Sequence, residues 1–359
     1  MTFPATVRDP AEITPAWLTA ALRAGGHRAT VTAVRHEPVG TGQMAACYRL
    51  HLRTAAAPGD DPVPSSLVAK VPPAGEDLGA LVAGAYRNEV AFYAQLAPTV
   101  AVRAPACWYH ATTDGGAGFT LLLEDLAPAR QGDQIAGCTP DQARDALVNL
   151  AGLHGPRWCD PTLADLACLA AADPEGAAVL AEVLGAATDT FCDRYGERLA
   201  PADREVLRAI PAVVAAWTLA RPERFAPVHG DYRLDNLLFP PAGPGVAAVD
   251  WQTVSLGLPA RDVAFLLGTS LAVGDRRAAE QALVAAYHGA LAGHGVGSYT
   301  LDECWDDYRF GLLQGPLIAV TGAAFSRRTD RGDDMFTAMA TRACAAVRDH
   351  GTLDLVTAG

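Results

Sequence analysis

The spacing of hydrophobic and polar positions changes along the chain. Before residue 124, short apolar or alternating runs bounded by turn residues predict strands at residues 29–34, 47–52, 66–71 and 119–123. Thr14-Pro15 opens an amphipathic segment that Gly25-Gly26 closes, so a helix is expected between them. Apolar residues at helical spacing predict another helix over residues 86–96. The first third of the chain should therefore combine short strands with helices.

After residue 139 the pattern becomes mainly helical. Thr139 and Gln142 form a capping box, and apolar residues then recur at helical spacing up to Leu153, before Gly155-Pro156. Further helices are predicted at about residues 174–192, 203–219, 275–292, 301–325 and 334–348. We place the boundary at the end of the strand over residues 119–123, which gives a first part of 1–124 and a second of 125–359.

Composition narrows the class of protein. A chain of 359 residues favours two lobes or two domains. The net charge of −12 and the isoelectric point near 5.1 argue against a nucleic-acid partner, which would require a basic face. The same charge permits a cationic substrate, but it is also that of an ordinary acidic protein.

The cysteines and the termini bear on location. The eight cysteines are scattered without CxxC pairs or histidines at zinc-ligand spacing, which indicates reduced thiols. The N-terminal residues lack the charged and apolar regions of a signal peptide, and the longest apolar stretch, 311–325, contains Gln314 and Pro316. We expect a cytoplasmic protein without a membrane partner, and the sequence leaves its oligomeric state open.

The most informative stretch is VHGDYRLDNLLF at residues 228–239, followed by VAAVDWQ at 246–252. Asp231 lies in a short loop between apolar segments and could accept the proton of an attacking alcohol. Asn236 and Asp250 offer oxygen ligands to magnesium on ATP. Arg233 could offset charge on a transferred phosphoryl group. Without this spacing, the Asp and Asn residues would indicate only a turn between strands.

The HGDxxxxN and VDW segments resemble the aminoglycoside phosphotransferase and choline kinase family. The resemblance implies a protein kinase-like two-lobed α+β fold, with an antiparallel sheet and one helix in the small first lobe and a large, mainly helical second lobe. It also implies that the protein uses ATP and Mg²⁺ to phosphorylate a small molecule. It makes Asp231 the catalytic base and Asn236 and Asp250 the magnesium ligands. It also implies that His229 and Asp262 brace the catalytic loop without taking part in the chemistry.

In the first lobe the resemblance has weaker support. Gly40 and Gly42, in VGTGQMA, would let the backbone approach the ATP phosphates. The same letters fit a dinucleotide fingerprint, but no helix or downstream acidic residue follows at the required places, and a plain hairpin turn is the other alternative. Lys70, in SLVAKV, would bind the α and β phosphates, and Glu89 would be its ion-pair partner. Alternatively, Lys70 extends to solvent and Glu89 is a surface charge.

Adenine and the acceptor are less determined. The backbone near Glu124 and Leu126 would hydrogen-bond adenine, by resemblance to the segment that joins the two lobes. An antibiotic, a sugar-like compound or an amino alcohol is the expected acceptor, and antibiotic resistance a possible role. The alternatives are a choline-like, steroid or hydroxyacyl thioester alcohol. From other classes, a nucleotide-binding pseudokinase and a nicotinamide-dependent oxidoreductase remain.

Overall fold

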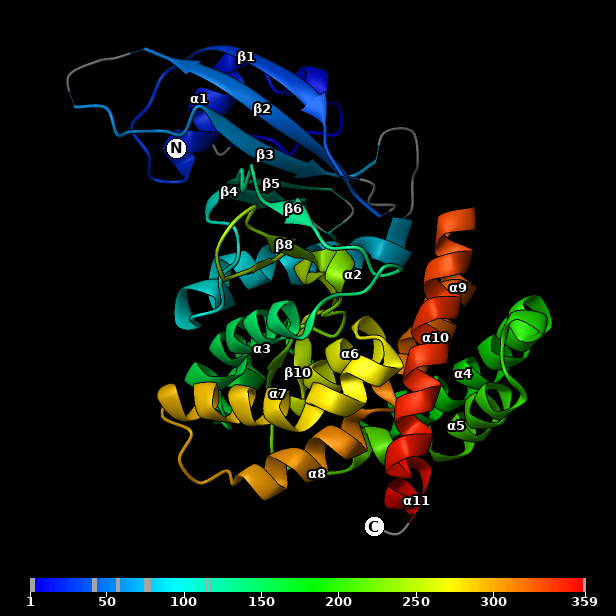
Figure 1. Ribbon diagram of the computed structural model, residues 1–359. Helices are drawn as coiled ribbons and strands as arrows, with labels where there is room; N and C mark the ends of the chain where they lie inside the picture. The colour runs from blue at the N-terminus through cyan, green and yellow to red at the C-terminus, as the bar shows by residue number, and fades with distance from the viewer. Residues whose placement is uncertain are drawn as a thin grey trace. The chain divides into compact units, whose positions relative to one another are not determined.

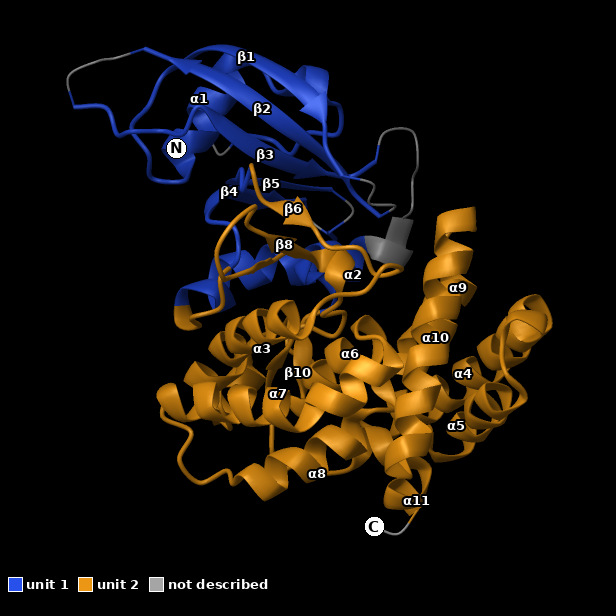
Figure 2. Ribbon diagram, in the orientation of Figure 1, with its two compact units in different colours: residues 1–98, 104–127, 250–253 blue, residues 99–103, 128–249, 254–359 orange. Residues whose placement is uncertain are grey.

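The computed structural model describes residues 4–40, 44–55, 59–73, 79–113, 115–116 and 118–357, with the side chains of 79–82 excluded. The chain forms two compact units, coloured blue and orange in Figure 2. Unit 1 contains residues 1–98, 104–127 and 250–253. Unit 2 contains residues 99–103, 128–249 and 254–359. Each unit has its own secondary structure, labelled in Figure 1.

Unit 1 is built on an antiparallel sheet with the strand order β1-β2-β3-β5-β4. Its strands are β1 (Val31–Pro38), β2 (Ala46–Thr54), β3 (Ser66–Val71), β4 (Cys107–Thr112) and β5 (Phe119–Glu124). The strands predicted from sequence are all present, and β4 is an additional one. β1 and β2 pair antiparallel, whereas a dinucleotide fingerprint requires parallel strands joined by a crossover helix. The dinucleotide-fingerprint alternative is therefore wrong.

Two helices pack on this sheet. α1 (Pro15–Ala24) starts as predicted, since the Thr14 hydroxyl accepts a hydrogen bond from the Trp17 amide at 3.1 Å. Leu18, Ala21 and Leu22 of α1 join the buried core of unit 1. α2 (Gly79–Ala91) continues into a π-helical segment, Phe92–Leu96, so the helix predicted over residues 86–96 begins earlier than expected.

Unit 2 is mainly helical (Figure 1). Its helices are α3 (Pro140–His154), α4 (Pro174–Tyr195), α5 (Pro201–Leu219), α6 (Ala260–Ser270), α7 (Val273–Gly293), α8 (Leu301–Gly311), α9 (Gln314–Phe325), α10 (Asp330–His350) and α11 (Thr352–Thr357). Short strands are β6 (Arg130–Gln131), β7 (Ala226–Val228), β8 (Leu237–Phe239), β9 (Ala247–Ala248) and β10 (Ser255–Gly257). β7 pairs with β10, and β8 pairs with β6 and β9.

One predicted helix is wrong in its extent. Residues 301–325 form two helices, α8 and α9, instead of one. Pro316 lies in the first turn of α9, where its missing N–H costs nothing, whereas the interior of a continuous helix would lose a hydrogen bond there. Gly311 ends α8 at a place where a Cβ would lie 2.9 Å from the Ala260 carbonyl oxygen, so α8 approaches α6 closely.

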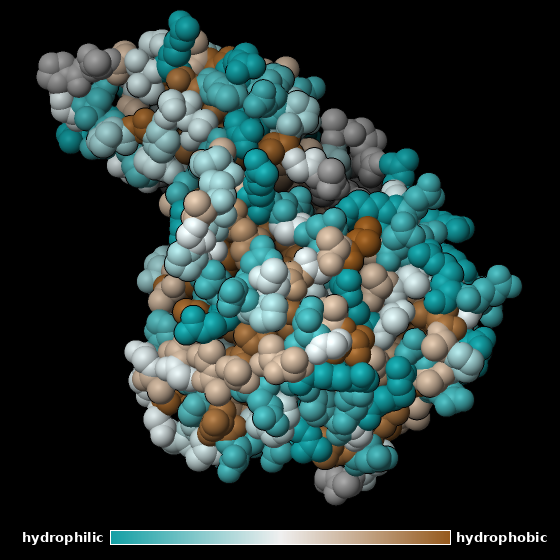
Figure 3. All heavy atoms as spheres, in the orientation of Figure 1, coloured by the Kyte–Doolittle hydropathy of each residue, from teal (hydrophilic) through white to brown (hydrophobic). Residues whose placement is uncertain are grey.

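The surface of the molecule is mixed in character. Figure 3 shows hydrophilic and hydrophobic side chains interspersed on the visible face. Exposed large hydrophobic side chains, such as Phe325 and Val179, belong to different helices. Among the described residues, none of the helices combines the length and apolarity that a membrane crossing requires.

Candidate active site

The catalytic-loop motif lies in unit 2, in the turn between β7 and β8. Gly230 has a φ of +81°, a left-handed conformation that glycine adopts without strain. The amides of His229 and Gly230 donate to the carboxylate of Asp262, at 2.6 and 3.0 Å. Asp262 is 1% exposed and belongs to the first turn of α6. The loop is therefore held from the protein interior by one buried carboxylate.

His229 connects the loop to the strand that precedes Asp250. Its Nδ1 accepts from the Asp231 amide at 3.3 Å, so its Nε2 carries the proton that is donated to the Val249 carbonyl at 3.1 Å. The ring is buried. His229 and Asp262 thus make the bracing contacts expected of them, and neither side chain is presented as a nucleophile or base.

The carboxylate of Asp231 is held by Arg233 and Asn236. Its Oδ2 accepts from Arg233 Nε at 3.0 Å and from Asn236 Nδ2 at 2.9 Å. Its Oδ1 also lies 3.0 Å from Arg233 Nε, within the same ion pair, and has no further hydrogen-bond donor among the described residues. Because a carboxylate oxygen can accept more than one hydrogen bond, Oδ1 keeps the capacity to accept from a substrate hydroxyl.

Arg233 contacts the carboxylate of Asp231, two residues earlier in the chain. Besides its bond to Asp231, its Nη1 lies 2.8 Å from the sulfur of Met335 and 3.6 Å from Asp235. The guanidinium is therefore already close to two carboxylates. This position suits a residue that orients Asp231 at least as well as one that contacts a phosphoryl group.

Sequence analysis did not identify three residues that hold the loop containing Asp231: Asp235, Gln134 and Arg331. Asp235 accepts two hydrogen bonds from Arg331, at 2.9 and 3.0 Å, and one from the Gln134 amide at 3.1 Å. Burial alone would raise the pKa of Asp235, but the Arg331 guanidinium outweighs it and holds this pKa below its usual range. Gln134 also accepts from the Leu234 amide through its side chain at 2.9 Å. Asp235 lies inside the motif, whereas no local pattern marks Gln134 or Arg331.

Unit 1 contains a buried charge cluster. Nζ of Lys70 lies 2.7 Å from Oε1 of Glu89 and 2.8 Å from Oδ1 of Asp250. Glu89 is 1% exposed, so the predicted ion pair is present, and the alternative of a solvated glutamate is wrong. Burial disfavours the charge on Lys70, but the carboxylates of Asp250 and Glu89 outweigh it and raise its pKa. Burial raises the pKa of Glu89. The carboxylate of Asp250 also raises it, since one lysine must compensate two carboxylates.

Two features single out this cluster. Lys70 is the sole lysine of the chain, and the other 27 of its 28 lysine and arginine residues are arginines. Asp250 has a φ of +69°, which is uncommon for a residue with a side chain. It also accepts from Gln252 Nε2 at 3.1 Å, and the neighbouring Trp251 stacks on Phe92 with 3.7 Å between ring centroids. Asp250 is thus fixed in a strained conformation within unit 1.

The remaining nucleotide-site predictions have partial structural counterparts. Gly40 has a left-handed φ of +78°, while Gly42 lies outside the described residues. The Glu124 amide donates to the Ala106 carbonyl at 2.8 Å, so this amide is not available to adenine. Leu126 follows the strand in a half-buried position. Any adenine contact must therefore use other backbone groups of this segment.

Several acidic residues of α8 and α10 have structural partners. Glu303 completes the capping box of α8, with its carboxylate 2.8 Å from the Thr300 amide. Asp333 accepts from the Tyr195 hydroxyl at 2.6 Å, and Asp334 pairs with an arginine of the same unit. These three carboxylates therefore stabilise unit 2 itself.

Comparison with known proteins agrees with this geometry. Residues 59–298 match the phosphotransferase enzyme family. The choline kinase of Cryptosporidium parvum superposes with a TM-score of 0.57 at 10% identity, covering 90% of this chain and 92% of that one. A complex of APH(2")-IIia with GDP and kanamycin gives 0.51 at 15% identity, covering 86% and 92%. The ethanolamine kinase of Plasmodium vivax gives 0.50 at 11% identity, covering 87% and 82%.

The chain also has one local sequence similarity to report. Over 48 residues the chain is 52% identical to acyl-CoA dehydrogenase family member 10 of Mus musculus. The match spans 13% of this chain and only 4% of that much longer protein.

The solved structures establish the fold: as the sequence predicted, it is the α+β fold of kinase-like phosphotransferases.

Proposed function

Since residues 59–298 match its defining pattern, the chain belongs to the phosphotransferase enzyme family, and we propose that it transfers the γ-phosphoryl group of ATP to a hydroxyl of a small molecule. The observation that carries the proposal is Asp231, whose Oδ2 is held by two donors while its Oδ1 lies only against the Arg233 guanidinium and keeps acceptor capacity. A carboxylate oriented in this way supports removal of a proton from an alcohol.

In the proposed reaction the acceptor hydroxyl donates to Oδ1 of Asp231. The hydroxyl oxygen attacks the γ-phosphorus, the bond to the β-phosphate oxygen breaks, and Asp231 takes the proton. Arg233 and the Asn236 amide keep the carboxylate in one orientation, which limits the entropy lost when the acceptor binds. Arg233 thereby acts on the acceptor through Asp231.

Lys70 and Gly40 are the proposed phosphate contacts. With Glu89 as its fixed partner, Lys70 would direct an ammonium group to the α and β phosphates. Nucleotide binding requires Lys70 to exchange the Asp250 carboxylate for phosphate oxygens, and its raised pKa keeps it charged throughout. Backbone groups of the segment around Glu124 and Leu126 are proposed to bind adenine.

The donor set fits magnesium. Asn236 directs its amide nitrogen at Asp231, so its amide oxygen faces away from that carboxylate. Asp250 supplies a carboxylate, and the described residues hold no cluster of three or more His, Cys, Asp or Glu that would suit a tighter metal cage. One carboxylate and one amide are typical of magnesium shared with nucleotide phosphates. When bound, magnesium would neutralise phosphate charge.

The acceptor is proposed as a hydroxylated small molecule, with an antibiotic, a sugar-like compound or an amino alcohol first. The relatives support this class, because choline, ethanolamine and kanamycin appear in their names. A role in antibiotic resistance follows only if an antibiotic is the acceptor. A cytoplasmic location is proposed because none of the eight cysteines forms a disulfide.

The sole lysine allows a direct test of nucleotide binding. An acyl phosphate of ATP acylates a nearby amine, and this chain offers only Lys70 and its N-terminus. We expect labelling of Lys70 that excess ATP or GTP prevents, and Asp231→Asn should be labelled equally. Magnesium-dependent turnover with kanamycin, choline, ethanolamine, sugars and hydroxyacyl thioesters should be lost in Asp231→Asn. Labelling without turnover in any arm would favour the pseudokinase, and failure to bind any nucleotide would refute the proposal.

A further inference from the structure

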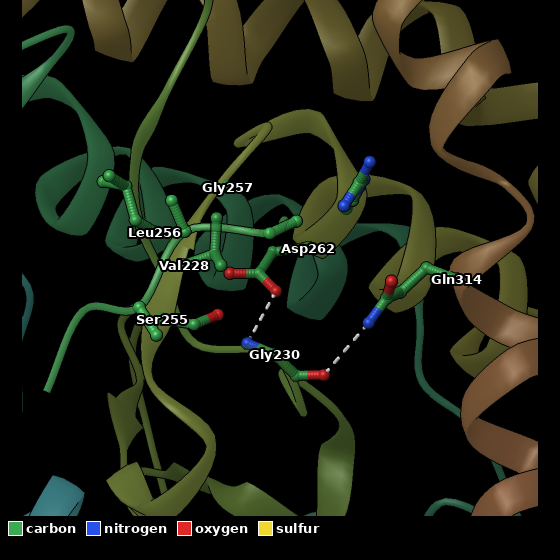
Figure 4. A pocket seen from close by; sticks show the side chains of 11 residues that line it. Val228, Gly230, Ser255, Leu256, Gly257, Asp262 and Gln314 are labelled. Atoms are coloured by element: carbon green, nitrogen blue, oxygen red, sulfur yellow. Dashed lines mark hydrogen bonds between the residues drawn. The ribbon is translucent and has the colours of Figure 1, made fainter. Parts of the chain in front are cut away.

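A cavity of about 240 Å³ lies beside the catalytic loop within unit 2 (Figure 4). It is lined by Ala170, Ala171, Ala172, Val228, Gly230, Ser255, Leu256, Gly257, Arg261, Asp262 and Gln314. At ~30 Å³ per molecule it would hold roughly eight waters, which suits a small ligand or one end of a larger one. Gly230, the residue before Asp231 in the chain, lines this cavity, so the cavity adjoins the loop that carries the proposed base.

The floor of the cavity is rigid. Figure 4 shows the Gly230 amide donating to Asp262 and the Gly230 carbonyl accepting from Gln314, at 3.0 and 3.3 Å. The amide of Leu256 donates to the carbonyl of Ala170 at 3.3 Å, which ties one wall to β10. The wall at 170–172 consists of alanines only, and these short side chains leave the space open.

Arg261 is the cation of this cavity, and its charge is incompletely compensated. Its Nη2 atom donates to the carbonyls of Trp217 and Thr218, at 2.7 and 3.1 Å. The guanidinium also stacks on the Trp217 ring, with Cζ 4.0 Å from the ring centroid. Its Nε is buried and has no hydrogen-bond partner among the described residues. Burial lowers the pKa of Arg261 to about 10, which leaves it charged at neutral pH.

Asp262 favours the charge on Arg261 and so opposes the lowering of its pKa, but it forms no ion pair with Arg261. Asp262 accepts from the amides of His229 and Gly230, so its oxygens are committed to the catalytic loop. The described residues form no ion pair with Arg261, whereas other half-buried arginines, such as Arg221 and Arg224, face the carboxylate of Asp307. A buried guanidinium with an unpaired N–H normally has an anionic partner, and here the space beside it is a cavity.

We propose that this cavity is the acceptor subsite and that Arg261 binds a carboxylate of the acceptor, which makes the substrate a hydroxylated carboxylic acid. The inference rests on the proposed phosphotransferase function and favours acidic acceptors over the amino alcohols and other cationic acceptors named there. A polycationic acceptor would bring ammonium groups close to Arg261 and is disfavoured there. Gln314 and the Gly230 carbonyl line the same space, and Ser255 offers a hydroxyl for the rest of the ligand.

The test compares acids with their neutral analogues, without nucleotide. Calorimetric titration of the full chain with 3-hydroxybutyrate, 4-hydroxybutyrate and the two corresponding amides measures the preference for a carboxylate. We expect the acids to bind roughly tenfold to a hundredfold more tightly than the amides, as for a charge-assisted hydrogen bond. Arg261→Gln should abolish the preference, and Arg261→Lys should retain part of it, because the charge remains without the planar donor pair.

Arg221→Gln is the matched control, because Arg221 also stacks on an aromatic ring, at 4.2 Å from Phe310, but does not line the cavity. It should leave the preference for acids unchanged. Equal binding of acids and amides, absence of acid binding, or a preference that survives in Arg261→Gln would each overturn the subsite. Turnover of neutral alcohols without any preference for acids would do the same while leaving the phosphotransferase proposal intact. Selective acid binding in a chain that binds no nucleotide would refute only the latter.

Discussion

The buried cluster of Lys70, Glu89 and Asp250 makes an asymmetric prediction about stability. The cluster holds one cation and two carboxylates, with Lys70 within 2.8 Å of both acids. Lys70→Met would leave the buried carboxylate of Glu89 and the partly exposed carboxylate of Asp250 without a cation. Breaking a buried ion pair in this way costs about 3–5 kcal/mol. Glu89→Gln removes the excess negative charge and leaves Lys70 paired with Asp250, so it should cost only about 1–2 kcal/mol, the worth of an impaired hydrogen bond.

The cost of Lys70→Met should also depend on pH. Burial already raises the pKa of Glu89 above its usual value, and loss of the lysine would raise it further. A carboxyl group whose pKa is higher in the folded than in the unfolded chain destabilises the fold as pH rises through the folded pKa. The deficit of Lys70→Met relative to wild type should therefore be smaller at pH 5.5 than at pH 8, and Glu89→Gln should not show this dependence.

Urea titration followed by circular dichroism gives the free energies of unfolding, and hydrogen exchange of β3 and α2 assigns the loss to unit 1. Arg49→Met is the matched control on the same sheet. Its partner Asp125 lies 2.7 Å away, and burial of Asp125 is outweighed by Arg49, which holds its pKa below its usual range. In Arg49→Met the Ala127 amide still donates to Asp125, at 3.1 Å, and favours its ionised form, so this variant should show no such dependence. Equal costs for Lys70→Met and Glu89→Gln, without any effect of pH, would refute the assignment of a coupled buried cluster.

Three further changes probe the site. Asp250→Asn keeps a residue type that tolerates a φ of +69°, so urea stability should hold while turnover falls at least ~100-fold; Asp250→Ala should lose about 1 kcal/mol as well. Lys70→Arg keeps a cation but not a compact ammonium, so the KM for ATP should rise while circular dichroism stays unchanged. Asp235→Asn should destabilise the fold by about 1–3 kcal/mol at pH 7. Because Arg331 holds the pKa of Asp235 below its usual range, wild type loses this advantage as pH falls through that pKa, and acid titration of both proteins should converge.

Local patterns predicted those parts of the fold whose causes are local. Strand β3 has the bounds expected from alternation, and the capping box at Thr139 and Gln142 marks the start of α3. The spacing from Asp231 to Asn236 works for the same reason, because one short loop determines both positions. Where the cause was a distant contact, sequence reasoning failed: α8 ends where Gly311 meets the backbone of α6, about 50 residues earlier in the chain.

The candidate site shows the same division. Asp235 lies within the motif, but its partner Arg331 is 96 residues away, and neither hydrophobic spacing nor turn chemistry links the two. Composition held one unused signal, the sole lysine. In a chain that uses arginine at 27 other basic positions, a single buried lysine marks a place that needs a compact ammonium group.

Residues 250–253 belong to unit 1, although the residues on both sides of them belong to unit 2. A single boundary along the sequence cannot describe this division. The pattern VAAVDWQ predicts a strand followed by an acid, and it assigns that acid to neither unit. Lys70, 180 residues earlier, and the stacking of Trp251 on Phe92 decide the matter. One residue before, the amide of Val249 donates to the carbonyl of Asn236 in unit 2 at 3.0 Å. Val249 and Asp250 are therefore consecutive in the chain but belong to different units.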